Sequence, residues 1–390
     1  MAAKALGGSA PTLAKLGGMR GALVCNGNLE RDADFAQRCR PDLLSSRHQD
    51  PELAERLPVL LVTAGWRQDE YRETHLKKAL YAIGLQPRLE RGHDTTVRNL
   101  SLFHNYQEFW RQRPSWQAAW EEREALIESA RTLYLEKNSF FIASLRSSLS
   151  RLRSYRGHLS LLEVLEGRLH SGSGLAKVLN YLSADIRATL SSLQSNDDHM
   201  VALLAELEDE FAHGLGLAFD PLWQDMRQEM SQRILDSNSL FMMGGHLPSL
   251  HRCLSFFQLR PALHEALRRG TTFYTSSAGS LLCCERIIIY NDFEDEREFQ
   301  LYDRGLALIG QLQIFPHCMD RIQTDDVDNL TYLAQRFRHR VCVGLNSESF
   351  LRLELGSQPR ATSCGAHDAV YVFDRSGQKM AYHQGQTLAL

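Results

Sequence analysis

A serine among small residues is the first candidate for chemistry in this chain. The stretch TSSAGSLLCC places Ser277 after the apolar run Thr272–Tyr274 and before a helix-like segment, Ala278–Cys284. A strand–turn–helix of this kind presents a nucleophile, because small neighbours tolerate the strained turn and the close packing behind it. Ser, Ala and Gly are equally common in an ordinary tight turn, so this stretch alone leaves both interpretations open.

An acid and a histidine follow Ser277 at similar places. Asp292 closes the β-branched run RIIIYND, and His317 ends the later run QIFPH. A serine nucleophile needs a base, and the base needs an acid that orients it. All three residues fall at expected strand ends, where ligands bind in an open parallel sheet, which favours acyl transfer. Asp295 takes the orienting role if the strand register differs.

Backbone N–H groups that would stabilise an oxyanion are also present. Ala278 directly follows the serine, and the N–H of that residue points towards the oxyanion in such turns. Gly244 and Gly245 end the preceding apolar run, SLFMMGG, and have no side chain to keep a second N–H away. We therefore expect an oxyanion hole from Ala278 and Gly245.

The elements that must position these groups alternate between strand and helix. GALVCNGN and LPVLLVTAGW predict strands, and Asp69–Ile83 predicts a helix after the second of them. After Ser239 the pattern resumes with the runs already named, a helix over Leu259–Gly270, and the later runs VCVGL and AVYVFD. This alternation is typical of an α/β fold with a doubly wound, mostly parallel sheet. We expect residues 21–84 and 239–374 to contribute to one sheet.

The middle of the chain shows helical patterning and almost no strand signal. It holds four of the five tryptophans, whose spacing indicates a helical core. We divide the chain into a disordered lead-in (1–20), a first part of the α/β domain (21–96), a large all-α insertion (97–230) and a second part of the α/β domain (231–390). The insertion rejoins just before Gly244, so we expect it either to overhang the site or to bind a protein partner or a second copy of the chain.

The composition excludes several classes of function. The 390 residues carry a net charge of −3 and are 43% hydrophobic, which is typical of a soluble globular protein without an electrostatic surface for nucleic acid or anionic membrane. We find no membrane-spanning run and no apolar core of a signal peptide. The eight cysteines lack disulfide or metal spacing, so we expect reduced thiols in the cytoplasm. No nucleotide or metal motif is present, so we expect neither cofactor nor metal.

Taken together, these motifs resemble the serine peptidase family that includes dipeptidase E and cyanophycinase. The resemblance covers roughly residues 21–88 and 231–375 and implies the class I glutamine amidotransferase-like, flavodoxin-like fold. It implies that Ser277 is the nucleophile, His317 the general base and Asp292 the orienting acid, with Gly245 and Ala278 as the oxyanion hole. The implied reaction is hydrolysis of a peptide or isopeptide bond through an acyl-enzyme on Ser277.

Several residues at the positions of the elbow and of substrate binding differ from the family pattern. Thr275 stands where the family has glycine before the elbow serine, and His246 follows the glycine pair in place of an amide or acid. Only Arg321 remains of the arginines that follow the histidine in the family, and we assign His246 and Arg321 to substrate binding. Asn346 and Ser347 replace two acids of the family, which puts a preference for aspartyl substrates in doubt.

Two further alternatives follow from the sequence. Cys283 and Cys284 lie after the elbow and not at it, so transfer of glutamine ammonia is not expected, and both are expected to be core thiols. The alternative to a hydrolase is a non-catalytic family member whose helical insertion binds a protein partner.

Overall fold

The computed structural model describes residues 20–45, 56–157, 159–167, 174–214, 216–290, 299–356, 359–365 and 369–389. Its centre is a seven-stranded, mostly parallel sheet in the order β13-β12-β1-β7-β6-β2-β5. The five parallel strands are β1 (Ala22–Asn26), β7 (Thr272–Ser276), β6 (Ser239–Met242), β2 (Val59–Val62) and β5 (Val97–Asn99). The two antiparallel strands at one edge are β12 (Phe350–Glu354) and β13 (Arg360–Ser363).

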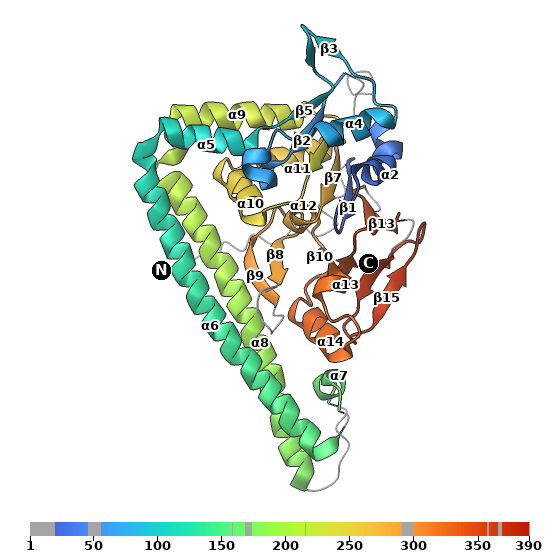
Figure 1. The fold of residues 1–390 in the computed structure, drawn as a ribbon. Coiled ribbons are helices and arrows are strands. Elements are labelled where there is room, and N and C mark those ends of the chain that lie inside the picture. The colour runs from blue at the N-terminus through green and yellow to red at the C-terminus, as the bar shows by residue number, and fades with distance from the viewer. Residues whose placement is uncertain are drawn as a thin grey trace.

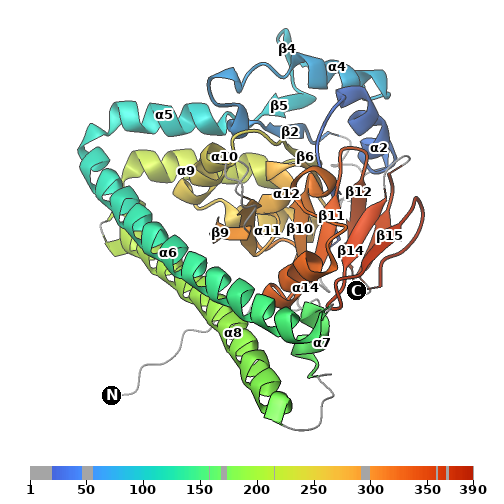
Figure 2. The ribbon, with the colours of Figure 1, turned by 60° about the horizontal axis from the view of Figure 1, so that its bottom comes forward.

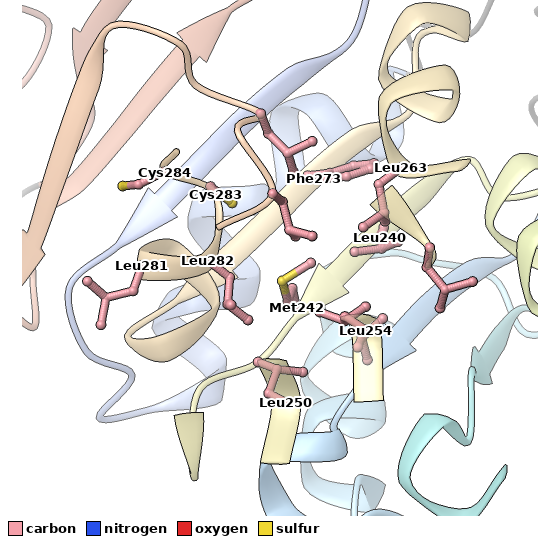
Figure 3. Close-up of a cluster of buried hydrophobic side chains, with 14 of the residues drawn as sticks. Leu240, Met242, Leu250, Leu254, Leu263, Phe273, Leu281, Leu282, Cys283 and Cys284 are labelled. Atoms are coloured by element: carbon pink, nitrogen blue, oxygen red, sulfur yellow. The ribbon is translucent and has the colours of Figure 1, made fainter. Parts of the chain in front are cut away.

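Helices cover both faces of this sheet because each buried strand is apolar on both sides. Leu240 and Met242 of β6 face α10 (Leu247–Phe256) and α11 (Arg260–Arg269), and Figure 3 shows their side chains among leucines of those helices and of α12 (Ala278–Leu282). Phe241, between them, faces α2 (Asp32–Leu44) and α4 (Thr74–Ala82). Cys283 and Cys284 are fully buried in the first of these two cores, which confirms that they are core thiols.

The expectation of a single sheet is wrong. A second, four-stranded sheet contains β10 (Leu312–Pro316), β11 (Val341–Leu345), β14 (Val370–Phe373) and β15 (Lys379–Tyr382). Among the described strands, β8 (Arg286–Tyr290) pairs only with β9 (Phe299–Arg304), and β3 (Leu89–Glu90) only with β4 (His93–Asp94). The reason is that β12 pairs along the whole of β1, from Ala22 opposite Glu354 to Asn26 opposite Phe350. That edge is therefore closed to β10.

In the described residues between β5 and β6, five α-helices follow one another in the sequence. They are α5 (Leu102–Gln112), α6 (Gln117–Arg156), α7 (Leu161–Leu165), α8 (Gly174–Asp209) and α9 (Pro221–Leu235). The helical stretch begins later than the expected boundary at residue 97, because Val97–Asn99 is a strand paired with β2. Helices α6 and α8 form a long antiparallel hairpin that runs beside the α/β part and extends past it (Figures 1 and 2). Within the ranges given above, no helix is both long and apolar enough to cross a membrane.

A buried polar cluster joins the helical hairpin to the α/β part. Arg336, the last residue of α14 (Val327–Arg336), is fully buried and contacts Asp197 of α8 through two hydrogen bonds of 2.7 and 3.0 Å. It also donates to the hydroxyl of Tyr134 of α6 at 3.1 Å. The hairpin is therefore fixed to the α/β part by a charged pair shielded from water.

Candidate active site

Ser277 occupies a strained turn between β7 and α12. Its backbone has φ 50° and ψ −112°, a region that non-glycine residues enter at a cost of about 1–3 kcal/mol. Gly279 must be small, because a Cβ there would lie 2.2 Å from the carbonyl oxygen of Met242. The expected strand–turn–helix with small neighbours is confirmed, and Ser277 stands at the carboxyl end of β7.

His317 lies beside Ser277 although the two residues come from different sheets. The Oγ of Ser277 and the Nε2 of His317 are 2.9 Å apart, a hydrogen-bond distance. His317 directly follows β10 and begins the short helix α13 (Cys318–Arg321), with a left-handed backbone of φ 55° and ψ 34°. A serine hydroxyl in contact with an imidazole nitrogen is the arrangement in which the ring can accept the hydroxyl proton.

The expected orienting acid, Asp292, and its substitute, Asp295, lie outside the described residues. The strand β8 (Arg286–Tyr290) forms within the run RIIIYND that the sequence predicted as a strand. Two members of the expected triad are therefore described, and the role of Asp292 stays a prediction.

The glycine pair after β6 approaches the serine as expected. A Cβ on Gly244 would lie 2.9 Å from the Cβ of Ser277 and 3.5 Å from the nitrogen of Ala278. Gly245 has a φ of 121°, and a Cβ there would lie 2.7 Å from the carbonyl oxygen of Gly65. Within the part of the chain that the structure describes, the N–H groups of Gly245 and Ala278 have no acceptor. Both donors are thus available near Ser277.

His246 contacts an arginine that the sequence did not single out. The Nε2 of His246 contacts a guanidinium nitrogen of Arg67, and its Nδ1 lies 2.9 Å from Ser249 Oγ. Burial and then the positive charge of Arg67 lower the pKa of His246. The Nδ1 of His246 also accepts from the backbone N–H of Ser249 at 3.3 Å, so the side chain of His246 caps the start of α10.

Arg321, the other residue assigned to substrate binding, ends α13. Its backbone N–H donates to the carbonyl oxygen of His317 at 3.0 Å, so Arg321 lies one helical turn beyond the base. His246 follows the glycine pair and caps α10. The two residues assigned to substrate binding therefore come from different elements.

Asn26 is the positioning residue that the sequence analysis missed. Its backbone oxygen accepts from the N–H of Ser277 at 3.1 Å and from Ser280 Oγ at 2.8 Å. Its side-chain amide donates to the carbonyl oxygens of Ser347 and Ser349, at 2.7 and 3.0 Å. Asn26 ends β1 of the central sheet, whereas Ser347 follows β11 of the second sheet, and β11 pairs with β10. The amide thus connects the sheet of Ser277 to the sheet of His317.

Metal ligands do not cluster in the described ranges. No group of three or more His, Cys, Asp or Glu side chains there could hold a metal ion. The polar groups around Ser277 are instead hydroxyls, amides and the His317 ring. These groups suit proton transfer and hydrogen bonding to an oxyanion.

Comparison with known proteins agrees with part of this chemistry. Residues 193–358, which include Ser277 and His317, match the model of Peptidase family S51. A solved structure described as a peptidase from an acI-B1 Actinobacterium is 10% identical, covers 96% of this chain and 98% of its own, and has a TM-score of 0.45. No curated protein matches the chain. The family match supports a peptidase, and hence a hydrolase.

Proposed function

We propose that this chain is a serine hydrolase of the dipeptidase E and cyanophycinase kind, which cleaves a peptide or isopeptide bond through an acyl-enzyme on Ser277. The observation that carries the proposal is the 2.9 Å contact between Ser277 Oγ and His317 Nε2 on a strained elbow. The match to Peptidase family S51 supports the same class of reaction.

Each residue then has a defined part in the reaction. His317 accepts the proton of Ser277 as the Oγ attacks the substrate carbonyl, and Asp292 orients the imidazole. The N–H groups of Gly245 and Ala278 donate to the oxyanion that forms. The imidazolium returns the proton to the leaving amine as the C–N bond breaks. A water molecule then attacks the acyl-enzyme and gives its proton to His317. The proton passes to the Ser277 oxygen as the C–O bond breaks and the acid is released.

The helical stretch has a proposed part as well. We interpret Leu102–Leu235 as an all-α insertion into the α/β domain, because β5 and β6 on either side of it both pair with β2. The insertion would restrict access to Ser277 and so favour short peptides. The same helices are the surface we propose for a protein partner or a second copy of the chain. We propose the cytoplasm as the location, since the eight cysteines are free thiols.

A fluorophosphonate probe tests the proposal directly. The probe should label the full chain at Ser277, and Ser277→Ala should abolish labelling together with any peptidase activity, because loss of a triad serine lowers turnover on the order of 10⁶-fold. Ser192→Ala is the matched control, since that exposed hydroxyl donates to the carbonyl oxygen of Ala188 within α8. A folded chain that the probe does not label would refute the acyl-enzyme and leave the partner-binding alternative.

A further inference from the structure

Arginine side chains gather where the helical hairpin meets the second sheet. The end of α14 and the turn that leads to β11 read RFRHR, with three arginines in five residues. A cavity of ≈ 510 Å³ opens beside this turn, and α8 and the start of β8 complete its walls. All of its described lining residues are polar or charged, and four of them are arginines: Arg286, Arg336, Arg338 and Arg340. We call this cavity the Arg338 pocket.

Two carboxylates line the Arg338 pocket, and each already has an arginine partner. Asp198 of α8 pairs with Arg286, and Glu285, just before β8, pairs with Arg340. The pair with Asp198 uses Nη2 of Arg286, whose Nη1 has no acceptor among the described residues. The carboxylates therefore cancel two of the four arginine charges, and Arg286 keeps N–H groups that can donate to a ligand.

The other two arginines have very different surroundings. Arg336 is fully buried and is neutralised by Asp197, as described above. Arg338 is exposed, and its guanidinium contacts no acceptor in the ranges that the structure describes. The pocket therefore keeps one positive charge that no carboxylate compensates.

The ring of His339, between Arg338 and Arg340, lies in the same positive potential. Burial and then the charges of Arg286 and Arg340 lower the pKa of His339 to about 4. Positive neighbours disfavour the protonated form of an imidazole. The two nearby ion pairs thus do not remove the positive potential in the pocket, and an anion would be attracted to it.

The Arg338 pocket is separate from the Ser277–His317 pair. Strands β10 and β11 run parallel and are paired over five residues. His317 directly follows the carboxyl end of β10, whereas Arg338 lies just before the amino end of β11. At about 3.3 Å per strand residue, roughly 15 Å separates the two ends. A ligand in the pocket can therefore bind without contacting the reacting atoms.

We propose that the Arg338 pocket binds a phosphate group, either as inorganic phosphate or as part of a small phosphorylated molecule. A phosphate carries about two negative charges at pH 7 and several acceptor oxygens, so it can accept from Arg286 and Arg338 together. The planar fork of guanidinium N–H groups matches this ligand. Arg286 begins β8, and Arg338 precedes β11, so the bound phosphate connects the two-stranded sheet to the four-stranded sheet.

Thermal unfolding of the full chain tests the proposal. Low-millimolar inorganic phosphate, at an ionic strength kept constant with sodium chloride, should raise the Tm by at least about 2 °C, because a ligand that binds the folded state stabilises it. Acetate should leave the Tm unchanged. Glycerol 3-phosphate distinguishes the two sources of the phosphate group: a larger rise than with inorganic phosphate supports a phosphorylated molecule, and an equal or smaller rise supports the free ion.

Two pairs of variants assign the effect to the pocket. Arg338→Gln should abolish the rise caused by phosphate, whereas Arg151→Gln, which alters an exposed arginine of α6 outside the pocket, should retain it. Asp198→Asn removes a competing negative charge and should tighten phosphate binding at least about threefold. Asp209→Asn is its control on α8, because Asp209 is 79% exposed and does not line the pocket.

The outcomes are independent of the proposed hydrolase function. No rise of the Tm with either phosphate, or an equal rise in Arg338→Gln, overturns the phosphate site even if the fluorophosphonate labels Ser277. An equal rise with acetate also overturns it, because the pocket would then respond to any anion. Arg338→Gln should keep the labelling rate of the natural chain, because Arg338 lies at the far end of β11 from His317.

Discussion

Replacement of Asn26 should uncouple Ser277 from His317, because its amide joins the two sheets. Asn26→Ala removes the donors to the carbonyl oxygens of Ser347 and Ser349 and the acceptor of the Ser276 hydroxyl, at 2.7, 3.0 and 3.1 Å. The side chain is fully buried, so water cannot readily replace it. Each orphaned buried group costs about 1–3 kcal/mol. Two of the three bonds are buried, so we expect the free energy of unfolding to fall by about 2–6 kcal/mol.

The effect on reactivity should exceed what lost stability explains. The carboxyl ends of β1 and β11 would no longer be held together. Ser277 and His317 would therefore shift relative to each other. A displacement near 1 Å can cost about 10²-fold in rate. The rate of fluorophosphonate labelling at Ser277 should therefore fall at least about tenfold in protein that circular dichroism shows to be folded.

Asn28→Ala is the matched control because Asn28 belongs to the same turn. Its amide lies 3.5 Å from the hydroxyl of Ser347, which is too long for a useful hydrogen bond. Urea unfolding and labelling are measured for both variants under the same conditions. If Asn26→Ala matches Asn28→Ala in both assays, Asn26 does not connect the two sheets in the way described.

Three further perturbations test other parts of the structure. Asp197→Ala should lower the free energy of unfolding by about 3–5 kcal/mol, because Arg336 would keep a fully buried charge without its carboxylate; a urea-unfolding loss below about 1 kcal/mol would contradict this. Gly244→Ala places a Cβ 2.9 Å from the Cβ of Ser277, so fluorophosphonate labelling of Ser277 should slow at least about tenfold. An unchanged labelling rate would show that Gly244 does not lie this close to Ser277. His246 has a lowered pKa, so its contribution to stability is complete above its ordinary pKa and is lost as the pH falls below that value. Acidification from pH 8 to 5 should therefore lower the Tm of the natural chain more than that of His246→Gln, and an equal drop would refute the assignment.

Local sequence patterns predicted the elements that end at the site, because each is a short run with a strong boundary. The runs before Ser277 and His317 are β7 and β10, and both residues follow them directly. The helix before β7 ends at Gly270, whose φ of 109° suits glycine. These features depend on a few neighbouring residues and could be read without knowledge of the rest of the chain.

The pairing of strands could not be read in the same way, because it depends on segments far apart. β12, the run FLRLE, alternates apolar and polar residues, but the LNSESF stretch that leads into it was interpreted through the family resemblance and not as the approach to a strand. The strand β12 occupies the edge of β1, so β10 cannot pair there. Asn26 lies in the run GALVCNGN, and its partner Ser347 is 321 residues away, so no local pattern indicates their contact. The Arg338 pocket likewise brings together residues from distant parts of the chain.

The two neighbours of β2 are made at very different times during synthesis. β2 pairs with β5, which follows closely, and with β6, which emerges only after residues 63–238. At about 5–20 residues per second, the ribosome needs on the order of 10–40 s for that interval. The α6–α8 hairpin has mainly local contacts and can fold within that time, whereas β1 and β2 must wait with apolar faces uncovered. A nascent chain stalled before Ser239 should thus contain a protease-resistant hairpin beside an unprotected N-terminal segment, a species for chaperones to bind.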